Sequence, residues 1–267
     1  MARLLPLAAY TPVARALEGR HVLYVPSRFG NAGDRLIAAG TYQFFADAGV
    51  HVVSPQAGPP SRARGCGPRP LAVVMAGGGN FGDLWPRNDA DRAACVADAD
   101  RMGLPSLVLP QSACGRSKTP TAAFVFAREA PSLDLLRAAG YASELAPDMA
   151  LYADPDLILG GPAPAPAERV GVLLRRDHES HGLAGTERGG GGGGFDPADP
   201  RRAATAAHYL LLAARYERIV TDRLHFAVAG LMLGRHVTLR PNCYHKNRGM
   251  YDAWLRGLGC AWEDASA

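Results

Sequence analysis

The chain has 267 residues and a formal net charge of +4; 48% of its residues are hydrophobic and 20% are charged. This composition is typical of a soluble globular protein with enough apolar material for a sizeable core. At roughly 150 residues per domain, the length favours two domains. The mild positive charge is compatible with an anionic ligand or an anionic membrane surface, and the lack of a basic tract argues against a nucleic-acid partner.

The cysteines and the apolar stretches predict a cytoplasmic protein. No two cysteines form a C-x-x-C pair, so neither a zinc knuckle nor a disulfide framework is indicated; they lie at Cys66, Cys95, Cys114, Cys243 and Cys260. The first 17 residues contain a short apolar run that Pro6 and Pro12 interrupt before a signal-peptide core could form. No apolar stretch approaches the roughly 20 residues of a membrane span. We therefore expect at most peripheral membrane association, at the inner face.

Strand-like and helix-like patterns alternate over the first 160 residues. Short apolar runs predict strands at residues 21–26, 51–55, 71–76 and 106–110. Helical spacing predicts helices at residues 36–48, from Pro86, and at residues 121–128 and 133–139. Residues 56–70 and the glycine-rich residues 77–83 are predicted as loops. This alternation indicates a parallel sheet that is covered on both faces, and hence an α/β fold.

A Gly, Pro and Ala-rich linker at residues 160–167 divides the chain into predicted domains at residues 1–160 and 161–267. In the second domain, strands are expected at residues 169–174, before Thr221, and at 236–240, and a helix is expected at 247–256. Residues 182–194 include six consecutive glycines and are predicted as a mobile loop. Asp199-Pro200 is expected to begin a helix whose buried stripe is Ala203, Ala207, Leu210, Leu211 and Ala214.

The pentapeptide Thr221-Asp222-Arg223-Leu224-His225 lies between a predicted strand and a predicted helix. Open α/β sheets bind ligands at this carboxyl edge. Arg223 would offer a forked set of donors to phosphate or carboxylate, and histidine is the side chain best suited to move a proton near neutral pH. The alternative interpretation is a helix cap with a surface charge and a structural histidine.

Other polar clusters also fall at predicted strand ends, and each has a structural alternative. Asn31 and Asp34 could cap a helix. The glycines that follow residue 76 could be a packing device instead of an anion cradle. Residues 110–112 could be a turn that ends a strand, and Arg175-Arg176 could be a solvated edge. Their shared position at one edge of the sheet nevertheless predicts a ligand site.

The order of these motifs resembles the polysaccharide pyruvyl transferase family over roughly residues 20 to 255. The motifs are Asn31-Ala32-Gly33-Asp34, Gly77 to Asp83, Leu109 to Ser112, Ala127-Arg128-Glu129 with Ser132, Pro147 to Ala150, Arg176-Asp177 with Glu179, Thr221 to His225, and Tyr244 with Lys246. The resemblance implies two Rossmann-like domains that face each other across a cleft, as in GT-B glycosyltransferases. It also implies that phosphoenolpyruvate gives its carboxyethylidene group to two hydroxyls of a saccharide, which is often lipid-linked in exopolysaccharide or cell-wall biosynthesis.

Under this resemblance His225 is the candidate general acid, while Arg223, Arg176 and Lys246 would hold the anionic groups of the donor. Asp34 or Asp83 would accept or orient a hydroxyl proton. No step requires a metal or a cofactor. We therefore expect catalytic roles for His225, Arg223 and Asp34. The expected substrate-binding residues are Asn31, Gly78, Gly79, Asn80, Asp83, Gln111, Ser112, Arg175, Arg176, Asp222 and Lys246.

Two alternative hypotheses of function remain open. A GT-B glycosyltransferase could hold the diphosphate of a nucleotide sugar in the same basic cleft, and it would release a nucleoside diphosphate. A catalytically inactive family member would bind an anion without any turnover. Ketal and phosphate as products would distinguish the pyruvyl transferase from both.

Overall fold

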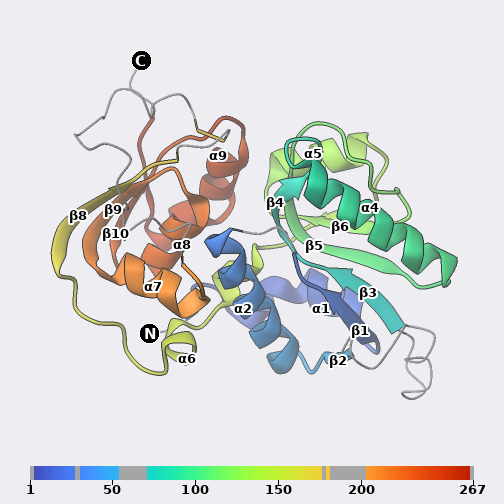
Figure 1. Ribbon diagram of the computed structural model, residues 1–267, viewed down its shortest axis with the longest axis horizontal. Coiled ribbons are helices and arrows are strands. Elements are labelled where there is room, and N and C mark those ends of the chain that lie inside the picture. Colours follow the sequence, from blue (N-terminus) through green and yellow to red (C-terminus); the bar gives the residue numbers. More distant parts are fainter. Residues whose placement is uncertain (1–2, 28–30, 54–70, 176–178, 181–202, 265–267) are drawn as a thin grey trace. The chain divides into compact units, whose positions relative to one another are not determined.

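The computed structural model describes residues 3–27, 31–53, 71–175, 179–180 and 203–264, and its contacts divide the chain into two compact units (Figure 1). The N-terminal unit comprises Leu5–Gly30 and Gly40–Tyr152. The C-terminal unit comprises Met1–Leu4, Asn31–Ala39 and Ala153–Ala267. The contacts thus assign the start of helix α2 to the C-terminal unit, although the sequence suggested a single boundary near residue 160.

The N-terminal unit is built on one parallel sheet with the strand order β2-β1-β3-β5-β6-β7, and β4 pairs with β5. The strands are β1 (His21–Val25), β2 (His51–Val53), β3 (Leu71–Met75), β4 (Gly78–Phe81), β5 (Ser106–Ala113), β6 (Phe124–Ala127) and β7 (Ser143–Leu145). The helices are α1 (Thr11–Leu17), α2 (Ala32–Asp47), α4 (Pro86–Arg101) and α5 (Ala130–Ala138), with 3-10 turns at Leu7–Tyr10 and Met149–Tyr152. The predicted parallel α/β arrangement is confirmed in this unit.

Strand β3, in the interior of this sheet, is apolar along its whole length because both of its faces are buried. All five residues of β3 are buried, as expected for a strand that is covered on both faces of a parallel sheet. The core cluster joins this sheet to α4 and α5 through Met75, Phe81, Val96, Val108, Val125 and Leu136. A second group of rings stacks edge to face where Tyr10 meets Tyr152 with ring centroids 5.2 Å apart. The helices therefore bury their apolar stripes against the sheet.

The prediction of a helix at residues 121–128 is wrong, because this segment forms β6. Phe124, Val125, Phe126 and Ala127 pair in parallel with both β5 and β7. An aromatic and β-branched run of four residues suits a buried strand, and a short apolar run cannot be distinguished from a buried helix by periodicity alone. Strand β7 was not predicted at all.

The prediction of a loop at residues 77–83 is also wrong, because Gly78–Phe81 is strand β4, whose Gly78 pairs with Gln111. A Cβ at Gly77 would lie 2.7 Å from the carbonyl oxygen of Pro110. Gly82 has a φ of +107°, and a side chain there would overlap the Cys114 carbonyl. At these two positions the glycines allow close packing against β5, which continues to Ala113 instead of ending at residue 110.

The C-terminal unit contains a second parallel sheet with the strand order β11-β10-β9-β8. The strands are β8 (Glu168–Leu173), β9 (Tyr216–Thr221), β10 (His236–Leu239) and β11 (Ala261–Trp262). The helices are α6 (Pro155–Leu159), α7 (Ala206–Ala214), α8 (Leu224–Met232) and α9 (Lys246–Met250), which a π turn (Tyr251–Leu255) and a 3-10 turn (Arg256–Leu258) continue. The predicted strands before Thr221 and at residues 169–174 and 236–240, and the helical stretch at 247–256, are confirmed.

Helix α7 departs from its prediction. It begins at Ala206, after Thr205, whose side chain accepts a hydrogen bond from the His208 N–H at 3.0 Å. The expected start at residues 199–200 lies outside the described residues, as do the predicted loops at 56–70 and 182–194. Leu211, expected in the buried stripe, is 45% exposed.

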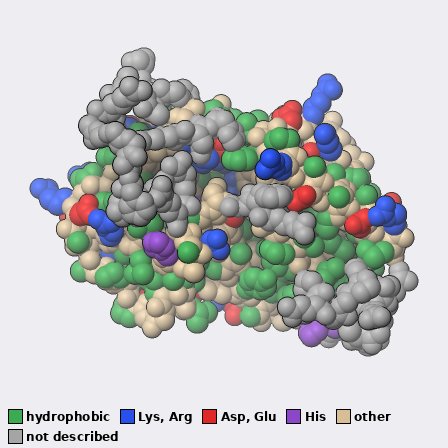
Figure 2. Space-filling model, viewed as in Figure 1, with side chains coloured by type: hydrophobic (Ala, Val, Ile, Leu, Met, Phe, Trp, Pro, Cys, Tyr) green, Lys and Arg blue, Asp and Glu red, His purple; other side chains and the backbone are tan. Residues whose placement is uncertain are grey.

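Charged side chains on the face drawn in Figure 2 are mixed in sign. Among the described residues visible there, Lys and Arg side chains lie singly among hydrophobic and acidic ones. No helix in the described ranges has both the length and the apolar character needed to cross a membrane.

Candidate active site

The register of the second sheet aligns the carboxyl ends of three strands. Thr221 is the register partner of both Leu173 on β8 and Leu239 on β10. The Thr221 hydroxyl donates to the Leu173 carbonyl at 2.5 Å and accepts from the Arg223 N–H at 3.0 Å. These bonds fix the turn between β9 and α8, so the predicted placement of the Thr221 motif at a strand-to-helix junction is confirmed.

Asp222 links this turn to the end of β8. Its Oδ1 accepts the Arg175 N–H at 2.7 Å, while its backbone carbonyl accepts from the Nδ2 of Asn247 at 2.7 Å. Asp222 is buried, and this burial raises the pKa of its carboxyl, although the hydrogen bond from Arg175 and the nearby Arg223 charge oppose the rise. Asp222 therefore acts as a buried connector between two strand ends.

A buried charge cluster lies beside this connector. The Glu179 carboxylate is 3.1 Å from the Nη1 of Arg175 and also pairs with the Nζ of Lys246. All three residues are buried, between 2% and 5% exposed. The Lys246 ammonium also lies 5.2 Å from the centre of the Tyr244 ring, in cation–π range. We call Arg175, Glu179, Arg223 and Lys246 the cationic cluster.

His225 lies in the first turn of α8 and is half-buried. The start of α2 packs directly against it: a Cβ at Gly33 would lie 2.7 Å from the His225 Nδ1. The Gly33 N–H donates to the Asn31 Oδ1 at 2.8 Å, and the Asn31 N–H donates to the Asp34 Oδ2 at 2.6 Å. The capping interpretation of Asn31 and Asp34 is thus confirmed, and the cap positions α2 beside the histidine.

Tyr209 on α7 is a residue of this site that the sequence did not reveal. It is 3% exposed, its ring centre lies 5.5 Å from that of Phe226, and burial raises its pKa above the ordinary range despite the charges of Arg223 and Arg175. Tyr209 is therefore a neutral phenol that lies near Arg223 and Arg175. Asn247 and the pairing of Glu179 with Lys246 were equally unpredicted, because their partners are distant in sequence.

The predicted residues of the N-terminal unit have mostly internal partners. Gln111 is fully buried, its Nε2 donates to the Ala76 carbonyl at 2.9 Å, and its Oε1 accepts the Asn80 N–H at 3.4 Å. The Ser112 hydroxyl donates to Glu129 at 3.0 Å and accepts from the Arg128 Nε at 2.8 Å. Both side chains therefore connect elements of the fold.

The remaining predicted residues of this unit lie around β4. Gly78 is buried and Gly79 is half-buried within the strand. The Asn80 Oδ1 accepts a hydrogen bond from Arg92, whose guanidinium lies 4.8 Å from the centre of the Phe81 ring. Asp83 is exposed and accepts from the Arg116 N–H at 3.3 Å.

The structure thus assigns the predicted residues to two groups. The C-terminal unit brings together Asn31, Asp34, Arg175, Asp222, Arg223, His225 and Lys246, whereas the N-terminal unit holds Gly78, Gly79, Asn80, Asp83, Gln111 and Ser112. Arg176 lies outside the described residues. The described part of the chain contains no cluster of three or more His, Cys, Asp or Glu residues suited to a metal ion.

Comparison with known proteins supplies the class to which this fold and site belong. Residues 31–242 match the model of the Polysaccharide pyruvyl transferase family, and the chain belongs to that family. It is 27% identical to a Bacillus subtilis (strain 168) protein named "Putative pyruvyl transferase EpsO", over 86% of this chain and 84% of that protein. The resemblance stated from the sequence motifs is therefore confirmed.

A solved structure shares the fold. It is the crystal structure of a functionally uncharacterised protein, KP1_0663, from Klebsiella pneumoniae subsp. pneumoniae NTUH-K2044. The alignment covers 96% of each chain with a TM-score of 0.66 and 20% sequence identity. At this identity the similarity concerns the fold alone.

Proposed function

We propose that this protein transfers the carboxyethylidene group of phosphoenolpyruvate to two hydroxyls of one saccharide, forming a cyclic ketal. Protonation of the methylene carbon C3 gives a methyl group and an oxocarbenium-like centre at C2. One hydroxyl adds to C2 with loss of its proton, and inorganic phosphate leaves as the C2–O bond breaks. The second hydroxyl then adds to C2 and loses its proton. One of the two hydroxyl protons balances the proton gained at C3, and the other leaves with phosphate or solvent.

The observation that carries this proposal is the charge balance at the carboxyl ends of β8 and β9. The buried charged residues here are three cations, Arg175, Arg223 and Lys246, and two carboxylates, Asp222 and Glu179, so this buried set carries one formal positive charge. The half-buried Asp34, the proposed proton acceptor, is not counted in this set. The raised pKa of Asp222 makes its negative charge costly there. A ligand with a phosphate and a carboxylate would complement this charge, and arginine suits both groups.

The start of α8 supports the placement of the phosphate. Arg223 is the N-cap residue of this nine-residue helix, and its side chain makes no capping hydrogen bond. A helix N-terminus carries a partial positive charge and presents backbone N–H groups to an anion. We assign phosphate binding to Arg223 and this first turn, with Arg175 and Lys246 at the carboxylate and Arg176 as a further donor ligand.

His225 is the proposed general acid that protonates C3, since it lies in the same helical turn as the phosphate ligands. Asp34 is the proposed acceptor of a hydroxyl proton; it lies in the same unit and is half-buried at the start of α2. Asp222 would orient Arg175 through its backbone hydrogen bond at 2.7 Å. No step in this scheme draws on a metal or a cofactor.

The finer architecture belongs to the same proposal. We infer a GT-B-like arrangement in which the N-terminal unit supplies the acceptor side, with Asn80 and Asp83 as polar ligands and the backbone of Gly78 and Gly79 beside them. Asn31 would contribute from the C-terminal unit. Gln111 and Ser112 would act by holding β4 and β5 in place. The family name supports a saccharide acceptor. A cytoplasmic location at the inner membrane face would suit a lipid-linked one.

Isothermal titration with phosphoenolpyruvate, and with a uridine diphosphate sugar in parallel, tests the donor. We expect phosphoenolpyruvate to bind the wild type, binding to be lost in Arg223→Ala, and binding without turnover in His225→Ala. Preference for the nucleotide sugar would instead indicate a glycosyltransferase. Near-normal turnover in both variants would refute the assignment of the Thr221 motif as the active site.

A further inference from the structure

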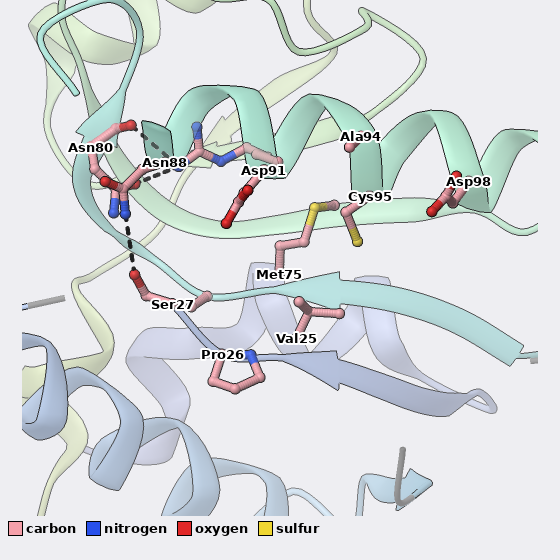
Figure 3. Close-up of a pocket in the computed structure, with 12 residues that line it drawn as sticks. Val25, Pro26, Ser27, Met75, Asn80, Asn88, Asp91, Ala94, Cys95 and Asp98 are labelled. Atoms are coloured by element: carbon pink, nitrogen blue, oxygen red, sulfur yellow. Dashed lines mark hydrogen bonds between the residues drawn. The ribbon is translucent and has the colours of Figure 1, made fainter. Parts of the chain in front are cut away.

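A pocket of about 340 Å³ lies at the carboxyl ends of two neighbouring strands of the N-terminal unit. Ser27 follows β1 and lines this pocket (Figure 3). Ala76, which follows β3, lines it too. Strand β2, which follows β1 in the sequence, pairs with one edge of β1, and the later strand β3 pairs with its other edge. The chain therefore leaves β1 towards β2 and leaves β3 towards β5, in opposite directions along the sheet. Such a topological switch point is where open α/β sheets bind ligands. The volume falls at the lower end of the range for small-molecule sites, about 300–1,000 Å³.

Helix α4 forms the opposite wall. Asp91, Cys95 and Asp98 follow one another at spacings of four and three residues, so they occupy one face of the helix. In Figure 3 these side chains lie on the part of α4 that faces Val25 and Met75. We call this cavity the α4 pocket.

The amide side chains close one end of the α4 pocket. The Asn88 Nδ2 donates to the Ser27 hydroxyl at 3.4 Å, and the Asn80 Oδ1 accepts from Arg92 (Figure 3). Arg92 is the one cation among the described lining residues, and Asn80 and Asp89 already engage its guanidinium. Burial lowers the pKa of Arg92 to about 10, so it remains charged at neutral pH.

The side chains that line the α4 pocket suit a neutral, hydroxyl-bearing ligand better than an anionic one. The lining holds two exposed carboxylates, Asp91 and Asp98, of which Asp98 also pairs with Arg101 outside the pocket. Because Asn80 and Asp89 already engage the single lining cation, Arg92, this lining disfavours phosphate and carboxylate. Carboxylates and amides are instead strong partners for hydroxyl groups. Val25, Met75 and the α4 side chains add an apolar wall against which the C–H faces of a sugar ring can pack.

We propose that the α4 pocket binds a neutral sugar ring of the acceptor, with its hydroxyls hydrogen-bonded to Asp91 and Asn88. This inference rests on the proposed function for the identity of the ligand. It adds an acceptor subsite whose residues, Asp91, Asn88 and Asp98, are separate from the cationic cluster.

Saturation-transfer NMR with the methyl glycosides of glucose and galactose tests the proposal on the full-length wild type, Asp91→Asn and Asp100→Asn. Asp100 is the matched control, because it is an exposed carboxylate on the same helix that does not line the pocket. We expect at least one glycoside to bind the wild type and Asp100→Asn alike, and to bind Asp91→Asn at least tenfold more weakly, since hydrogen bonds to charged groups are the strong ones. Bound glycoside should also slow alkylation of Cys95 but not that of Cys243, which is exposed in the other unit.

The donor is measured separately so that the two proposals can fail separately. Phosphoenolpyruvate should bind all three proteins with the same Kd. Loss of glycoside binding in Asp91→Asn supports the α4 pocket even if phosphoenolpyruvate does not bind, an outcome that would overturn the proposed function only. Equal glycoside binding by Asp91→Asn and Asp100→Asn, or no binding by the wild type, would overturn the α4 pocket as a saccharide site whatever the donor does.

Discussion

Replacing Glu179 by Gln tests the charge balance of the cationic cluster. The change is isosteric and removes the one carboxylate shared by Arg175 and Lys246, which are both about nine-tenths buried or more. Removing one partner of a buried ion pair typically costs about 3–5 kcal/mol, because the remaining charge is left desolvated. Glutamine keeps an acceptor oxygen for one of the two cations, so we expect a loss of about 3 kcal/mol from the free energy of unfolding.

Tryptophan fluorescence can follow the C-terminal unit alone. Trp254 and Trp262 belong to this unit and Trp85 to the other, so a Trp85→Phe background restricts the signal to the relevant unit during urea unfolding. Inorganic phosphate should restore much of the lost stability, since a ligand at 100 times its Kd stabilises the folded state by about 2.7 kcal/mol. The gain should be larger for Glu179→Gln than for the wild type, because the variant carries one more net positive charge.

Glu263→Gln is the matched control within the same unit. Glu263 pairs with Arg240 at 2.8 Å, but its side chain is 43% exposed, and exposed pairs contribute about 0–1 kcal/mol. Phosphate should not stabilise this variant more than the wild type. If Glu179→Gln and Glu263→Gln unfold at the same urea concentration and respond equally to phosphate, the reasoning about the buried cations is refuted.

Three further predictions follow from other contacts. Gly33→Ala should lower kcat about 100-fold with an unchanged Kd for phosphoenolpyruvate, because the new Cβ would displace His225, and misplacement by about 1 Å can cost this factor; equal kcat would contradict the role of this contact. The free energy of unfolding of the wild type relative to Asp222→Asn should rise as the pH falls through the raised folded-state pKa of Asp222 towards 3.8, the ordinary pKa of an aspartate, since the native state binds that proton more readily; a pH-independent difference would refute this. Arg128→Met should destabilise the protein by about 3–5 kcal/mol in thermal or urea unfolding, because it removes the cation whose Nη1 lies 2.5 Å from the buried carboxylate of Asp148; a loss below about 1 kcal/mol would contradict it.

The sequence predicts the local structure around Thr221 better than that around Gly78, for a physical reason. A strand-to-helix junction such as the Thr221 motif is local, so a change of periodicity and a threonine before the helix are enough to locate it. The pairing of Glu179 with Lys246 joins residues 67 positions apart. No local pattern encodes such a contact. The partners follow β8 and β10, and the pairing of both strands with β9 brings them together.

Strands β4 and β6 show a second limit of local patterns. Gly78 and Gly79 have low intrinsic strand propensity, and their extended conformation depends on the pairing of β4 with β5. Residues 121–128 contain enough alanine to suggest a helix, yet pairing on both sides makes Phe124–Ala127 a strand. In both segments the tertiary context overrides local propensity.

The family motifs of this chain divide into two physical classes, and this division predicts how substitutions should behave. In the N-terminal unit, Gln111, Ser112 and Asp148 have their polar atoms bonded inside the fold. In the C-terminal unit, Arg223 and Lys246 lie in a set whose net charge is positive. A motif residue of the first class preserves geometry, so its substitution should lower stability while the molecules that still fold keep their affinity for phosphoenolpyruvate. Substitution of Arg223 should instead lower the affinity for phosphoenolpyruvate while stability is largely kept. An equal loss of stability in both classes would contradict this division.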